Sequence, residues 1–117
     1  MKKQNAVAIL AALAQDNRLD VFRLLVEAGP DGMPAGHVAS SLRLPPSALS
    51  FHLDRLREAG LVSVRRDGRS LIYAARFKAM NALVGYLTDH CCQGRPELCK
   101  PKARGAGARK RETRMPA

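Results

Sequence analysis

The sequence predicts a mainly α-helical domain with one β-hairpin, the arrangement of a winged helix-turn-helix. Two observations lead to this fold class: short helical segments meet at a Pro-Pro break, and two strand-like segments joined through an Asp-Gly dipeptide follow them. The 117 residues correspond to one domain, long enough to bury a core without disulfides. No apolar run approaches the ~18–20 residues that span a bilayer, so we expect a cytoplasmic protein that makes no membrane contact.

Breaker residues and helical periodicity divide the chain into five predicted helices. In the second, Leu19, Phe22 and Leu25 recur at helical spacing, and Asp16 or Asn17 is placed to cap its start. Gly and Pro residues at 29–32 end it. The other predicted helices span residues 6–13, 34–42, 46–59 and 76–92.

The segments 61–65 and 70–74 have strand-like sequences, and the Asp67-Gly68 dipeptide between them is a strong hairpin signal. Three arginines bracket this turn: Arg65, Arg66 and Arg69. Guanidinium groups on a protruding hairpin suit contact with DNA phosphates or the minor groove. The alternative is a charged edge that prevents strand-to-strand aggregation. Beside a helix that binds DNA, we favour the first interpretation.

The helix predicted over 46–59 has two faces. At about 100° per residue, Leu49, Leu53 and Leu56 face the core, whereas the outer face carries Ser47, Ser50, Phe51 and Asp54. A recognition helix places its N-terminal residues at base edges in the major groove. Hydroxyl groups can hydrogen-bond there, and an apolar ring can contact a thymine methyl.

Two further residues flank this outer face. His52 and Arg55 are expected to contact phosphates. Capping and ordinary solvated surface would also explain Ser47 and Ser50. An exposed Phe51 favours the DNA-binding interpretation, because exposed large apolar side chains usually have a partner.

Positive charge is concentrated at the C-terminal end of the chain. The net charge is +10, and residues 100–117 contain seven basic residues and one acid among Gly, Ala and Pro. This tail has little to bury, so we expect it to be disordered, either as a solubilising extension or as a nonspecific phosphate-binding arm. The sequence therefore divides into a DNA-binding and dimerisation domain over 1–92 and a cysteine-containing turn with a basic tail over 93–117.

These segments resemble a known family. Residues 47–62 resemble the Ser-x-x-Ser-x-His-Leu and Leu-x-x-Ala-Gly-Leu-Val signature of the ArsR/SmtB repressors, residues 17–25 resemble that family's second-helix motif, and residues 66–73 resemble its wing. The resemblance implies a homodimer that binds double-stranded operator DNA and represses metal or metalloid resistance genes. It also implies that the first and last helices form the dimer interface; their apolar residues are Val7, Leu10, Leu13, Phe77, Met80, Leu83, Val84 and Leu87.

The candidate effector ligands are the three cysteines, Cys91, Cys92 and Cys99. The family's founding arsenic sensors use a Cys-x-Cys in the third helix, which is absent here, and its zinc, cobalt and nickel sensors use Asp and His pairs on the last helix. Here Asp89 and His90 are adjacent and no second His follows. Three thiolates select a soft ion, and three sulfurs match As(III) or Sb(III). The pattern also resembles one arsenic-responsive branch of the family.

Other interpretations of the cysteines remain open. The site would also suit cadmium, mercury or zinc, the last as a Cys₃His site with His90. Cys91 falls on the apolar stripe of the last helix and would also fit a buried interface position. A thiol redox sensor or enzyme is the alternative from a different functional class. A vicinal Cys-Cys is not the Cys-x-x-Cys of thiol oxidoreductases, and no accompanying acid or base is apparent, so we expect no enzyme.

Overall fold

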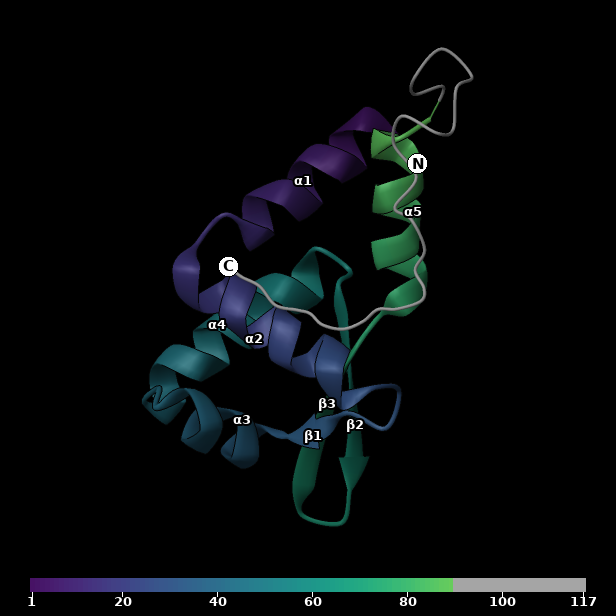
Figure 1. Cartoon of the computed structure of the whole chain (residues 1–117). Coiled ribbons are helices and arrows are strands. Elements are labelled where there is room, and N and C mark those ends of the chain that lie inside the picture. Colours follow the sequence, from purple (N-terminus) through teal and green to yellow (C-terminus); the bar gives the residue numbers. More distant parts are fainter. Residues whose placement is uncertain (90–117) are drawn as a thin grey trace, which may run out of the picture. The chain divides into compact units, whose positions relative to one another are not determined.

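The computed structural model describes residues 1–89, which form helices and short strands around one core (Figure 1). The elements are α1 (Lys3–Leu13), α2 (Asp16–Ala28), β1 (Met33–Pro34), α3 (Ala35–Leu42), α4 (Pro46–Glu58), β2 (Val62–Asp67), β3 (Ser70–Ala75) and α5 (Phe77–Leu87). The chain divides into the compact unit Met1–Leu87 and a second unit, Thr88–Ala117, of which only the first two residues are described. The predicted boundary after residue 92 lies outside the described residues.

Helix α2 is the centre of the core. Its Val21 and Leu25 are fully buried, and the helix contacts α1, α3, α4 and β3. Helix α4 contributes Leu49, Leu53 and Leu56, each at most 2% exposed. The apolar spacing that predicted the α4 face is therefore confirmed, because residues three and four apart share one side of a helix. In α2 the prediction holds for Phe22 and Leu25 but not for Leu19, which is 45% exposed.

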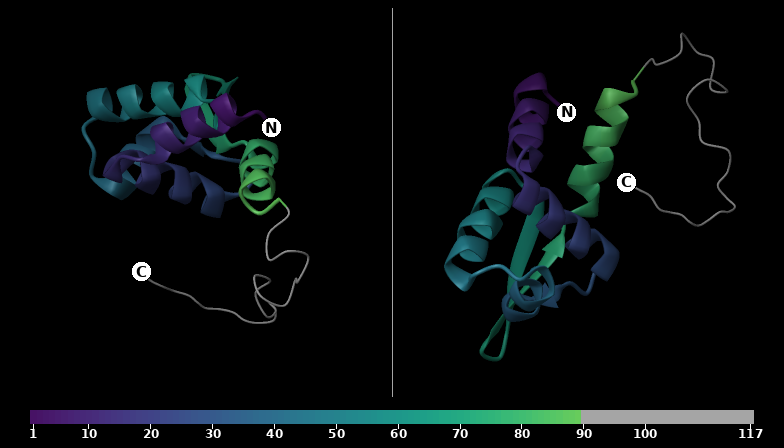
Figure 2. Two further views of the ribbon diagram at one scale, coloured as in Figure 1. Left: turned by 90° about the horizontal axis from the view of Figure 1, so that it is seen from above. Right: turned by 60° about the vertical axis from the view of Figure 1, so that its left-hand side comes forward.

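The strands form an antiparallel sheet in the order β1-β3-β2. Pairing of Asp67 with Ser70 leaves Gly68 and Arg69 as the loop, one residue later than the predicted Asp67-Gly68 turn. Only Gly68 of these two has a positive φ, as a type II′ hairpin requires. Figure 2 shows this hairpin projecting beyond the helices of the described part.

Strand β1 was not predicted. It is two residues long and contains Pro34, so it has no detectable period, yet it pairs with β3 at the sheet edge, where proline is tolerated. Gly32 precedes it with φ +74°, and a Cβ at this position would overlap the carbonyl oxygen of Tyr73. The α2–β1 loop therefore lies directly against the sheet.

Two helix ends differ from the sequence-based expectation. Gln15, not Asp16 or Asn17, caps α2: its side-chain oxygen accepts a hydrogen bond from the backbone N–H of Arg18 at 2.9 Å. Helix α5 ends at Leu87 and does not continue to residue 92 as predicted. The cysteines, and the tail that we expected to be disordered, lie outside the described residues.

Candidate nucleic-acid interface

Helices α3 and α4 form the helix-turn-helix. Arg43, in the left-handed conformation with φ 57°, ends α3, and Pro46 occupies the first turn of α4, where a missing N–H is harmless. Ser47 and Ser50 are exposed near the start of α4, and Phe51 is 51% exposed. The structure therefore places these three predicted DNA-binding residues on the accessible side of the helix.

The structure does not place His52 on the flank of the exposed face, where the sequence predicted it to contact phosphate. His52 is only 8% exposed, because its position lies three residues after Leu49 and adjoins Leu53 on the buried side of α4. Its Nδ1 has no hydrogen-bond partner among the described residues. Burial and, secondarily, the charge of Arg18 lower its pKa from the usual 6.5. A neutral, buried imidazole packs the recognition helix onto the core and does not attract an anion.

Arg55 is exposed as predicted, but it already has two contacts on its own helix. Its guanidinium carbon lies 4.8 Å from the centre of the Phe51 ring, and its Nη1 donates to Glu58 Oε1 at 3.0 Å. Arg57 and Asp54 form a second ion pair at 3.5 Å. The charges on the exposed side of α4 therefore cancel, so attraction to the phosphate backbone must come mainly from other elements.

The wing supplies basic side chains, but its arginines are not equivalent. In the β2–β3 register, Arg66 lies opposite Leu71 and Arg65 opposite Ile72, so the two arginines lie on opposite faces of the hairpin. Arg65 Nη1 donates to the backbone oxygen of Asp31 in the α2–β1 loop at 3.1 Å. Arg66 is exposed without such a contact, and Arg69 is in the hairpin loop.

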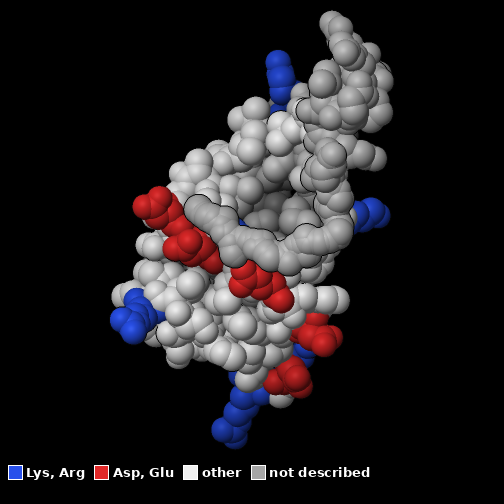
Figure 3. All heavy atoms as spheres, viewed as in Figure 1, with Lys and Arg blue, Asp and Glu red and all other residues white. Residues whose placement is uncertain are grey.

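Charge is distributed unevenly over the face seen in Figure 3. Basic side chains project at the end where Figure 1 places the β2–β3 turn, and acidic side chains follow α2. The acids of α2 are Asp16, Asp20 and Glu27. The same helix carries Arg18 and Arg23, and Arg23 pairs with Glu27 at 3.4 Å, so α2 offers phosphates little net attraction, whereas the arginines of the hairpin would attract them.

Recognition helix α4 stands between two hollows. The first, of about 180 Å³, separates α4 from the wing and has a mainly apolar lining: Ala35, Gly36, Ala39, Pro46, Leu49, Ser50, Leu53, Leu71 and Tyr73. Ser50 therefore lies on the wing side of α4. Arg66 shares the sheet face of Leu71 and Tyr73. Arg66 therefore belongs to the sheet face that borders this hollow, although it does not line the hollow itself.

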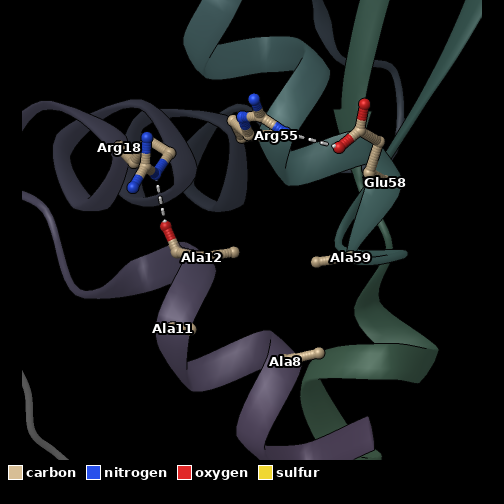
Figure 4. Close-up of a pocket in the computed structure, with 7 residues that line it drawn as sticks. All are labelled: Ala8, Ala11, Ala12, Arg18, Arg55, Glu58 and Ala59. Carbon is tan, nitrogen blue, oxygen red and sulfur yellow. Dashed lines mark hydrogen bonds and ion pairs between the residues drawn. The ribbon is translucent and has the colours of Figure 1, made fainter.

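The second hollow, of about 310 Å³, lies on the opposite side of α4, against α1 and α2 (Figure 4). Methyl groups of Ala8, Ala12 and Ala59 border it, and Arg55 and Glu58 lie at its α4 side. Arg18 Nε donates to the carbonyl oxygen of Ala12 at 2.7 Å, which satisfies a group left open at the end of α1. With hollows on both sides, the exposed face of α4 stands out as a ridge bearing Ser47 and Phe51.

An apolar surface on α1 and α5 is separate from this interface. Val7 and Leu10 on α1, and Val84 and Leu87 on α5, are 42–58% exposed. Leu13, Phe77, Met80 and Leu83 were predicted to belong to the same surface, but the structure packs them into or against the core. The expected apolar face of α1 and α5 is thus narrower than the sequence predicted.

The predicted metal ligands Cys91, Cys92 and Cys99 lie outside the described residues. Within residues 1–89, no three His, Cys, Asp or Glu side chains are grouped as a metal site would require. None of the helices in that range is long and apolar enough to cross a membrane. The three-thiolate site therefore stays a prediction.

Comparisons with known proteins agree with the arrangement of α2 to β2. A helix-turn-helix domain family matches residues 13–65. The HTH-type transcriptional regulator YgaV of Escherichia coli is 33% identical over 89 residues, 76% of this chain and 88% of the relative. A putative arsenical resistance operon repressor, ArsR, of Halobacterium salinarum is 35% identical over 78 residues, 67% of this chain and 60% of the relative.

The fold also matches a solved structure. The homodimeric winged helix-turn-helix DNA-binding domain of Mb0332 from Mycobacterium bovis, described as a possible ArsR-family transcriptional regulator, superimposes with a TM-score of 0.59. The match has 26% sequence identity and covers 74% of this chain and 81% of that structure. The winged helix-turn-helix predicted from the sequence is thereby confirmed.

Proposed function

Because this chain belongs to the winged helix-turn-helix transcriptional regulators of the ArsR/SmtB type, we propose that it is a cytoplasmic homodimeric repressor, released from its operator when As(III) or Sb(III) binds Cys91, Cys92 and Cys99. The observation that carries the DNA-binding part is the α4 ridge, where Ser47 and Phe51 are exposed beside a basic wing. Relatives that are transcriptional regulators support this role rather than an enzymatic one.

The N-terminal half of α4 enters the major groove. Ser47, Ser50 and Phe51 set base preference, because they occupy the exposed part of the helix nearest its start. Arg66 and Arg69 contact phosphates or the adjacent minor groove from the hairpin. Arg65 holds the hairpin against the α2–β1 loop, and His52 supports α4 from the buried side.

A second copy covers the apolar surface of α1 and α5. Val7, Leu10, Val84 and Leu87 are all large and at least 42% exposed, which favours burial between copies. The matched Mb0332 domain is itself homodimeric. A two-fold dimer places two α4 ridges about 34 Å apart, the spacing of half-sites one turn of DNA apart.

The three cysteine thiols determine which kind of ion can act as the effector. Cys91, Cys92 and Cys99 lie within nine residues of one another, so one subunit can supply all three. Thiolate ligands select soft ions, and As(III) takes three sulfurs. The name of the Halobacterium relative supports the arsenical assignment. A repressor that responds to another soft metal ion, or to thiol oxidation, is the alternative.

Release requires that the effector bind the free conformation more tightly than the DNA-bound one. Helix α5 is the element through which this difference acts, because it precedes the cysteines and carries part of the dimer surface. A change at the end of α5 alters the dimer geometry and hence the distance between the two α4 ridges. A coupling of about 1–3 kcal/mol per site is typical of such effects.

Selection of bound duplexes from a random library, followed by gel-shift titration, tests the proposal. We expect a pseudo-palindromic site, bound without metal and released by arsenite or antimonite but not by zinc or cadmium at equal concentration. Release by cadmium, zinc or mercury alone, or by hydrogen peroxide alone, would support the alternatives. Absence of sequence-specific duplex binding would contradict the repressor itself.

A further inference from the structure

We propose that Phe51 and Arg55 read DNA as one unit, with the ring on the C5-methyl group of a thymine and the guanidinium on the guanine of the next base pair. The inference rests on the proposed function, and it names the base step that α4 recognises. It also changes the role of Arg55, which the sequence assigned to phosphate.

The pair is already assembled in the free protein. Phe51 is 51% exposed, yet its ring is held on two sides: the Arg55 guanidinium lies over it at 4.8 Å, and the buried His52 ring meets it at a centroid distance of 5.9 Å and an angle of 64°. Cation–π contact and an edge-to-face aromatic pair restrict its motion. An exposed ring fixed in this way loses little freedom on binding.

The ring can discriminate one base by its apolar character. Among the groups in the major groove, the C5-methyl of thymine is the apolar one, whereas cytosine lacks it and exposes an amino group nearby. Phe51 has no polar atom with which to contact a phosphate or a base edge. Its position on the α4 ridge, one turn after Ser47, places it among the residues that enter the groove.

Arg55, which lies over the Phe51 ring, recognises the second base pair of the step. Arginine binds the O6 and N7 of guanine in a bidentate manner. Neighbouring base pairs are stacked ~3.4 Å apart, so two groups held 4.8 Å apart can reach adjacent base pairs without separating far. Glu58 lies 3.0 Å from Arg55 and would repel a phosphate at this position. This exposed ion pair stabilises little and exchanges readily for guanine.

Base analogues in the selected operator test each contact without altering the protein. At the thymine of the step, uracil removes only the methyl group, and at the guanine, 7-deazaguanine removes only N7. We expect uracil to weaken binding of the full-length wild-type protein about fourfold, the value for burying one methyl group. The Phe51→Ala variant should bind the thymine and uracil duplexes equally, and Arg55→Ala, which has no donor for N7, should be indifferent to 7-deazaguanine.

A matched control is Leu19→Ala, which removes an apolar side chain of α2 that is 45% exposed, similar to Phe51. It should keep the wild-type response to both analogues. Phe51→Ala should also reduce the response to 7-deazaguanine, because Arg55 loses the ring that orients it. Circular dichroism checks that each variant is folded.

The outcomes separate this inference from the function on which it rests. A wild-type protein that selects a specific operator but tolerates uracil at every thymine would overturn the Phe51–Arg55 unit and leave the repressor intact. Retention of the thymine preference by Phe51→Ala would overturn it as well. A protein that selects no duplex would overturn both.

Discussion

Arg65 in β2 and Asp31 in the α2–β1 loop join two parts of the domain, because Nη1 of Arg65 donates a hydrogen bond to the backbone oxygen of Asp31 at 3.1 Å. Arg66, the next residue, lies on the other face of the hairpin, opposite Leu71. Neighbouring arginines in one strand thus have different surroundings. We assign Arg65 to positioning the wing and Arg66 to contact with DNA.

This division predicts different effects on stability. Arg65→Ala should lower the free energy of unfolding by about 0.5–1 kcal/mol, the range for one exposed hydrogen bond. Arg66→Ala should change it by less than about 0.5 kcal/mol, as expected for a surface residue without such a contact. Urea denaturation of the two variants measures the difference. Equal losses of stability would show that the hydrogen bond to Asp31 does not hold the wing.

Arg66→Gln and Arg69→Gln should weaken binding to specific and unrelated duplexes alike. In the homodimer each substitution removes one phosphate contact per subunit, two in all, so the slope of log K against log salt should become shallower by about two. Titrations of one operator and one scrambled duplex at several salt concentrations measure both quantities. A changed base preference with an unaltered salt slope would mean that these arginines read bases instead.

The buried His52 predicts a pH-dependent stability. Its pKa is lowered from 6.5, first by burial and then by Arg18, so the unfolded chain takes up this proton at a higher pH than the folded protein does. Stability should therefore fall as the pH drops below about 6.5 and level off below the folded-state pKa. His52→Leu should lose this component in urea denaturation between about pH 5 and pH 8. If His52→Leu kept the wild-type pH profile, another titratable group would cause the pH dependence of stability.

Disruption of the α1 surface should separate the copies. Leu10→Glu places a charge in the proposed interface, and burying an unpaired charge is costly. Leu19→Glu, at a residue of similar exposure on α2, serves as the control. Sedimentation equilibrium should show a monomer for Leu10→Glu and a dimer for wild type and Leu19→Glu. If Leu10→Glu were dimeric like Leu19→Glu, the interface would not include this part of α1.

The sequence predicted the fold well because apolar residues recur at helical spacing in the core helices and because Gly follows the ends of α2 and α4. Its errors have local causes. His52 follows the exposed Phe51 by one residue, and a histidine at the edge of an apolar face has no pattern that distinguishes burial from exposure. Strand β1 is too short to show a period, and it becomes a strand only by pairing with β3.

The candidate site was predictable only in part. Exposure of Ser47 and Phe51 follows from helical spacing, and the i,i+3 pairing of Arg55 with Glu58 follows the same rule. The partner of Arg65 does not, because Asp31 lies 34 residues earlier in the chain and offers a backbone oxygen that every residue has. Such a contact emerges only when the loop and the hairpin are placed by the core.

Fluorescence anisotropy of labelled operator measures most directly whether arsenite bound to Cys91, Cys92 and Cys99 releases the DNA. Arsenite is titrated into the complex of DNA with wild type and with Cys91→Ser, Cys92→Ser and Cys99→Ser. We predict normal DNA binding by all four proteins, release of the wild type, and weakened or abolished release of each variant. Wild-type release by one variant would remove that cysteine from the site, and wild-type release by all three would contradict the account.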